Sequence, residues 1–186
     1  MVDQERKIDL FDEGTMIVGL DECNHGRYPE FFVAAASNTL QDGFPLTPMK
    51  LNKRRVRKPS PLSSMGLRKY TFLEVIDGDY GRIRPKENFI GTVATSLIHE
   101  SIGPDLDQLI LFIDGTISTK QMCHTKDMLA DYTPLKKTQI HITGGPKYDE
   151  IYPIVNLADS IANSLWKMRG EENSRREKHR RDFLRD

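Results

Sequence analysis

Two short, continuous apolar runs in this chain end directly on acidic residues, and this feature constrains the fold most. The first run, 16–20, ends on Asp21 and Glu22, and the second, 109–113, ends on Asp114. Runs this short and this apolar are typical of strands buried inside a sheet. If the two strands are parallel neighbours, their carboxyl ends meet at one edge of the sheet. Asp21 and Asp114 would then lie close together.

Hydrophobic periodicity and turn residues predict the other elements. We expect further strands at 31–37, 69–76 and 139–143, and helices at 85–101, 119–130 and 154–169. Three early strands followed by alternating helices and strands indicate an α/β fold with a mixed five-stranded sheet flanked by helices. We therefore expect one domain over residues 1–170. The charged segment that follows, 171–186, is either a helix extension or a tail.

The composition is that of a folded soluble domain, and it does not indicate a binding partner. Hydrophobic residues make up 38% of the chain and charged residues 29%, as in folded soluble domains. No apolar run approaches the roughly 20 residues that a membrane span needs. The mixed, polar start of the chain is not a secretory signal, and two cysteines, Cys23 and Cys123, form no disulfide framework. An intracellular, cytoplasmic location is the expectation.

A third acidic position lies in the last expected helix. Asp159 has small and apolar neighbours, which suggests that it faces inward or borders the buried stripe. Carboxylates converging in a partly buried site repel one another unless a cation neutralises them. Oxygen ligands favour Mg²⁺ or Mn²⁺, and two such ions can support phosphodiester cleavage. The alternative interpretation is that each acid is an ordinary turn or helix-surface residue.

The pattern of strands and acids resembles the ribonuclease H-like superfamily, and two segments resemble type 2 ribonuclease H. Gly19-Leu20-Asp21-Glu22, Gly26 and Val33-Ala34-Ala35-Ala36 are similar to that family's G-x-D-E-V-G-R-G…V-A-A-A opening. The segment 111–115, Leu-Phe-Ile-Asp-Gly, is similar to its central I-D-G strand end. The resemblance implies a ribonuclease H-like fold. It also implies that Asp21, Glu22 and Asp114 are catalytic residues that bind two Mg²⁺ or Mn²⁺ ions.

The resemblance leaves two candidates for a fourth ligand. Asp149 has the spacing found in type 2 enzymes. Asp159 lies in a segment, 156–162, similar to the Q-x-A-D-x-x-A helix of a domain family of unknown function that is itself predicted to be ribonuclease H-like and that opens with D-E-S-G. We prefer Asp159, because a helix packed on a sheet holds a ligand more rigidly than a loop does.

One loop departs from the type 2 pattern. Where that family has a G-R-G loop that senses the ribose 2′-hydroxyl, this chain has Asn24-His25-Gly26. His25 is a candidate for contact with substrate or for proton transfer. The departure leaves open whether the substrate is an RNA–DNA hybrid, RNA or DNA.

A basic segment, 43–69, has no acidic residue and several prolines, which predicts a loop or arm rather than a helix. Phosphate contacts from Lys and Arg give sequence-independent affinity for nucleic acid. A solvated loop or contact with an acidic protein is the alternative. The candidate nucleic-acid-binding residues, including two near the first acids, are His25, Arg27, Lys50, Lys53, Arg54, Arg55, Arg57, Lys58, Arg68 and Lys69.

Three hypotheses about function follow. The leading one is a metal-dependent endonuclease that hydrolyses RNA in an RNA–DNA hybrid or another duplex-like substrate. The second keeps the fold but makes the protein a catalytically inactive nucleic-acid-binding or scaffolding subunit. The third is hydrolysis or phosphotransfer on a small phosphate ester, against which the basic segment argues. The sequence does not indicate an oligomeric state.

Overall fold

The computed structural model describes residues 14–23, 30–37, 69–75, 88–99, 102 and 104–183. Its centre is a five-stranded sheet in the order β3-β2-β1-β4-β5. β1 pairs antiparallel with β2 and parallel with β4, β2 pairs antiparallel with β3, and β4 pairs parallel with β5. The predicted mixed sheet is therefore confirmed. The strands are β1 (Thr15–Cys23), β2 (Glu30–Ser37), β3 (Lys69–Val75), β4 (Gln108–Asp114) and β5 (Ile140–Gly145).

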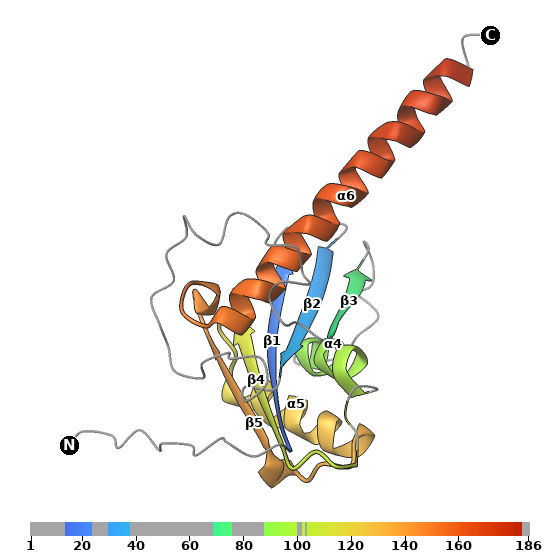
Figure 1. Cartoon of the computed structure of the whole chain (residues 1–186). Helices are drawn as coiled ribbons and strands as arrows, with labels where there is room; N and C mark the ends of the chain where they lie inside the picture. Colours follow the sequence, from blue (N-terminus) through green and yellow to red (C-terminus); the bar gives the residue numbers. More distant parts are fainter. Residues whose placement is uncertain are drawn as a thin grey trace.

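Helices cover both faces of this sheet (Figure 1). One face carries α4 (Phe89–Ile98) and α5 (Thr119–Tyr132), and the other carries α6 (Pro153–Phe183). Two short 3₁₀ turns, η4 (Lys137–Gln139) and η5 (Tyr148–Glu150), flank β5. Each side of the sheet therefore has its own apolar core, as expected for an α/β domain.

The two central strands supply both cores by strict alternation. In β1, Val18 and Leu20 lie in the core under α4 and α5, whereas Ile17 lies in the core under α6. In β4, Leu111 lies in the core under α4 and α5, and Phe112 lies in the core under α6. Burial on both faces explains why these strands are continuous apolar runs rather than alternating ones.

α6 lies unusually close to β1. A Cβ atom on Gly19 would run into the backbone of Ile154 and Val155 in the first turn of α6. Only glycine permits so close an approach at this position. Farther along, Arg169 Nε lies 3.3 Å from Glu74 Oε1, which ties α6 to β3 at the edge of the sheet.

Several boundaries differ from those predicted. β1 continues past its apolar run to Cys23, because Asp21, Glu22 and Cys23 all pair with β2. α4 runs from Phe89 to Ile98, within the predicted helix 85–101, of which residues 85–87 and 100–101 lie outside the described residues. α6 continues beyond residue 169 to Phe183 and projects away from the sheet, so the charged segment forms a helix extension over this range (Figure 1).

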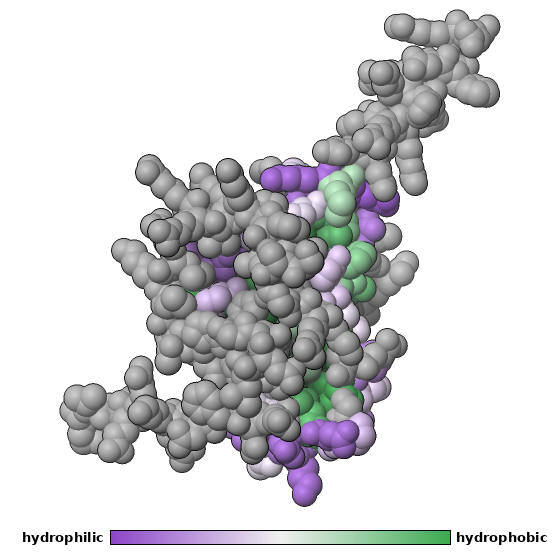
Figure 2. Space-filling model, in the orientation of Figure 1, coloured by the Kyte–Doolittle hydropathy of each residue, from purple (hydrophilic) through white to green (hydrophobic). Residues whose placement is uncertain are grey.

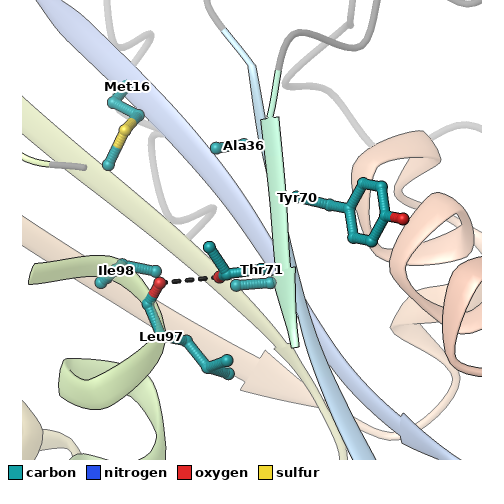
Figure 3. Close-up of a pocket in the computed structure, with 7 residues that line it drawn as sticks. Met16, Ala36, Tyr70, Thr71, Leu97 and Ile98 are labelled. Carbon is teal, nitrogen blue, oxygen red and sulfur yellow. Dashed lines mark hydrogen bonds between the residues drawn. The ribbon is translucent and has the colours of Figure 1, made fainter. Parts of the chain in front are cut away.

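One small hollow opens under β3, on the α4 side of the sheet (Figure 3). Met16, Ala36 and Leu97 are among its lining residues, and the Thr71 hydroxyl donates a 2.7 Å hydrogen bond to the Leu97 carbonyl beside it. It has room for about one water molecule and an almost wholly apolar lining, which excludes it as a substrate site. It also lies at the opposite end of β1 from Asp21.

The described surface is mixed in character, with hydrophobic patches visible among hydrophilic residues (Figure 2). The large exposed hydrophobic side chains include Phe72, Tyr132, Trp166 and Met168. Within the ranges that the structure describes, no helix combines the length and the apolar character that a membrane crossing requires.

Candidate active site

The parallel pairing of β1 with β4 brings the two predicted strand-end acids together. Leu20 pairs with Ile113, so Asp21 and Asp114 are the next residues on neighbouring strands. By the alternation that places Ile17 under α6, both acids also lie on the α6 face of the sheet. The sequence-based expectation that these acids meet at one edge of the sheet is confirmed.

Asp21 is the most deeply buried of the predicted site acids, with 3% of its surface exposed. Burial, together with the nearby charges of Glu22, Asp114 and Asp159, raises the pKa of its carboxyl from 3.8 to about 9. A 2.7 Å hydrogen bond from the Glu22 backbone N–H to Asp21 Oδ1 opposes this effect only in part. This environment therefore favours the protonated form of Asp21 at neutral pH.

α6 contributes Asp159 to this group. The first turn of the helix packs on Gly19, and Asp159 follows about one turn later. Asp159 is near enough to Asp21 for its charge to raise the pKa of Asp21. Asn163 Nδ2 donates to Asp159 Oδ1 at 2.6 Å and to the Asp159 carbonyl at 3.0 Å, which fixes the half-buried carboxylate along the helix.

The other candidate for the fourth ligand, Asp149, lies in η5, in the turn between β5 and α6. Its backbone N–H lies 3.4 Å from Asp114 Oδ1, and its carbonyl accepts a 2.9 Å hydrogen bond from Asn156 Nδ2. The charge of Asp149 is not among the causes that raise the pKa of Asp21. Asp159 is therefore the acid that shares the electrostatic environment of Asp21.

Successive side chains of a strand leave it on opposite faces, so the side chain of Glu22 leaves β1 on the face opposite to that of Asp21. It is half-buried, and its charge still ranks second, after burial, among the causes that raise the pKa of Asp21. Glu22 thus belongs to the same charged group but stands at its rim.

The side chains of the four acids are of the chemical type that binds a divalent cation. Asp21, Glu22, Asp114 and Asp159 offer only carboxylate oxygens, the ligands that Mg²⁺ and Mn²⁺ prefer. Burial and, after it, repulsion from the other acids raise the pKa of Asp21, and a bound cation would relieve that repulsion. Among the residues described, no three potential ligands already stand close enough to hold an ion. Binding would therefore require the side chains to draw together.

The predicted nucleic-acid-binding residues cannot be placed in the same way. His25, Arg27 and the basic residues from Lys50 to Arg68 lie outside the described residues. Lys69 is the first residue of β3, where only its backbone is described. Their role remains a prediction from the sequence.

Sequence reasoning missed the residues that hold these acids in place. Tyr148 donates its backbone N–H to Asp114 Oδ1 at 2.6 Å, and Asn163 holds Asp159. Asn163 follows Asp159 by four residues, a spacing at which helical side chains are neighbours, so it could have been found. Tyr148 lies in a turn, where no periodicity indicates which residue faces an acid.

The fold is ribonuclease H-like. Three solved structures with this fold are similar to the chain over 86–87% of its length. The PCNA:RNase HII complex from Archaeoglobus fulgidus has a TM-score of 0.58 at 15% identity, with 77% of that chain covered. Ribonuclease H2 from Pyrococcus horikoshii OT3 has 0.54 at 16%, with 76% covered. Bst-RNase HIII in complex with Mn²⁺ has 0.54 at 18%, with 55% covered.

At these identities the likeness defines the fold and no more. No protein-family model matches the sequence, and no curated protein matches it. Because one fold can host different functions, only the chemistry of the site can indicate an activity.

Proposed function

We propose that the protein is a metal-dependent endonuclease that hydrolyses phosphodiester bonds, with RNA in an RNA–DNA hybrid or another duplex as the substrate. The observation that carries this proposal is that Asp21 lies beside Asp114 on neighbouring strands, with Glu22 and Asp159 near enough for their charges to act on it. The ribonuclease H-like fold supports it, as does the Mn²⁺ bound by one of the structures that share it.

In this proposal the four carboxylates hold two Mg²⁺ or Mn²⁺ ions. Such ions, when bound, activate water and stabilise the leaving oxygen of the phosphodiester. Asp21 lies deepest, so its ionisation is the one most closely coupled to binding of a cation. Asn163 holds the carboxylate of Asp159, and the turn after β5 holds that of Asp114, so both acids are oriented before an ion arrives.

The basic segment 43–69 supplies the affinity for nucleic acid in this proposal. Its lysines and arginines would bind phosphates without reading sequence, and this contribution weakens as salt rises. β3, which begins at the last residue of the segment, is one of the two edge strands of the sheet. The segment therefore enters the fold two strands away from Asp21.

The test is cleavage of matched RNA–DNA, RNA–RNA and DNA–DNA duplexes in Mg²⁺ and in Mn²⁺. We expect Asp21→Asn to abolish cleavage while the variant stays folded by circular dichroism. Asp105→Asn is the matched control, because Asp105 is an exposed acid outside the site. If Asp21→Asn cleaves as fast as the wild type, the proposal is wrong.

Calorimetric titration with Mn²⁺ separates an enzyme from an inactive binding module. The proposal predicts Mn²⁺ binding to the wild type that is lost in Asp21→Asn and in Asp114→Asn. A wild-type protein that binds duplexes but neither binds Mn²⁺ nor cleaves any of the three substrates would instead be a scaffolding subunit with the same fold.

A further inference from the structure

The turn that joins β5 to α6 lies directly against Asp114. Asp114 and Gly145 are paired at the ends of β4 and β5, and the Gly115 N–H donates a 3.1 Å hydrogen bond to the Gly145 carbonyl. The turn then brings the Tyr148 N–H to 2.6 Å from Asp114 Oδ1, and the Asp149 N–H to 3.4 Å. One oxygen of a proposed ligand is thus held by the backbone of a neighbouring turn.

The backbone of the turn is shaped to point these N–H groups at the acid. Lys147 has φ 65°, in the left-handed region that non-glycine residues seldom adopt. This residue reverses the chain just before Tyr148, so that the next amides face back toward β4. At the far end of the turn, Asn156 on α6 donates to the Asp149 carbonyl at 2.9 Å. The turn is therefore tied down on both sides.

The side chain of Tyr148 anchors the turn to the strands that carry the site. Its hydroxyl lies 3.0 Å from Thr143 Oγ1 on β5, and its ring lies over Gly145, where a Cβ atom would collide with it. The ring also contacts Tyr152, with centroids 4.7 Å apart. Tyr152 in turn stacks on Phe112 at 4.4 Å, two residues before Asp114 on the same strand face.

We propose that Tyr148 is a positioning residue for the metal site. Its ring and hydroxyl fix the turn, and the turn's N–H groups fix the orientation of the Asp114 carboxylate before a cation binds. This inference rests on the proposed function, since it assigns Asp114 as a ligand. It adds a residue outside the acidic motifs whose removal should weaken cation binding without removing any ligand.

The experiment measures Mn²⁺ affinity by calorimetry in the full-length protein. Tyr148→Phe and Thr143→Val each remove one end of the hydroxyl contact, and we expect each to weaken Mn²⁺ binding by about 3-fold to 10-fold. Tyr148→Ala, which also removes the ring, should weaken it by about 10-fold to 100-fold, the range seen when groups that orient metal ligands are lost.

Two internal controls distinguish positioning from general loss of structure. Thr143→Ser keeps the hydroxyl and should bind Mn²⁺ like the wild type. The double variant Tyr148→Phe/Thr143→Val should bind no more weakly than either single variant, because both changes remove one contact. Tyr132→Phe, which alters a tyrosine that is 66% exposed on α5, should leave Mn²⁺ affinity unchanged.

A metal-free readout comes from the amide proton of residue 148 in an NMR spectrum. Its hydrogen bond to a carboxylate predicts a strong downfield shift, which should move upfield in Thr143→Val and in Asp114→Asn. Unchanged Mn²⁺ affinity and an unchanged amide shift in Tyr148→Phe and Thr143→Val would overturn the inference, whereas the proposed function would stand. If the wild type binds no Mn²⁺, the proposed function fails and the inference fails with it.

Discussion

The burial of Asp21 among three other carboxylates predicts that this acid destabilises the metal-free protein. Its pKa is about 9 in the folded state, against 3.8 as its ordinary value, so the folded state binds a proton that the unfolded state releases. Stability associated with this group is therefore fully present below pH 3.8 and is lost as pH rises toward 9. The loss amounts to about 1.4 kcal/mol per pH unit within that window.

At pH 7 the accumulated loss is on the order of 4 kcal/mol, a large part of the 5–15 kcal/mol that typically stabilises a domain. Asp21→Asn removes the ionisable group and keeps a similar shape. In EDTA we therefore expect the variant to be more stable than the wild type at pH 7 by several kcal/mol, with the two converging near pH 4. Urea unfolding at pH 4, 5, 6, 7 and 8 measures the difference.

Asp105→Asn again serves as the control, because this exposed acid should give the same pH dependence as the wild type. Mn²⁺ at about 100 times its Kd should stabilise the wild type by about 2.7 kcal/mol and Asp21→Asn by much less. Parallel curves of unfolding free energy against pH for the wild type and Asp21→Asn in EDTA would show that the reasoning from burial is wrong.

Three further predictions follow from the same geometry. Gly19→Ala should destabilise the fold by about 1–3 kcal/mol in urea unfolding, because its Cβ meets the backbone at Ile154; an unchanged midpoint would contradict the close packing. Asp159→Asn should lower cleavage about 100-fold or more and Asp149→Asn less than about 3-fold, because of these two acids only Asp159 is among the charges that raise the pKa of Asp21; the reverse order would make Asp149 the ligand. Replacing the basic residues of 50–69 with Gln should weaken duplex binding and flatten its dependence on salt in a filter-binding assay, whereas an unchanged salt slope would place the phosphate contacts elsewhere.

The strands near the site could be predicted because strands buried on both faces have a recognisable hydrophobic pattern in the sequence. Continuous apolar runs before Asp21 and before Asp114 indicate strands buried on both faces, and such strands are typically parallel neighbours. Asp159 could be found for a related reason, since small and apolar residues surround it on a helix that packs on the sheet. Each of the three acids therefore follows or interrupts an apolar segment, which is why the sequence alone could identify it.

The end of α6 could not be predicted in the same way. The apolar face of this helix fades after Leu165, yet the helix continues to Phe183. Periodicity predicts a helix from its apolar face, and the sequence from residue 170 to residue 182 has no such face to detect. The sequence beyond Gly170 is rich in Glu, Arg and Lys, which are good helix formers, so its composition favours a helix although its hydrophobic pattern does not indicate one.

The placement of Asp21 depends on a close approach that periodicity also does not reveal. Ile17, Gly19 and Asp21 are successive residues on one face of β1, and they meet α6 in three different ways. Ile17 joins the core, Gly19 lets the helix backbone rest on the strand, and Asp21 lies beneath the segment that carries Asp159. The glycine is thus what allows the helix to cover the acid. The covering that removes Asp21 from water is also what brings the carboxylate of Asp159 to it, so the burial of Asp21 and the approach of Asp159 have one structural origin.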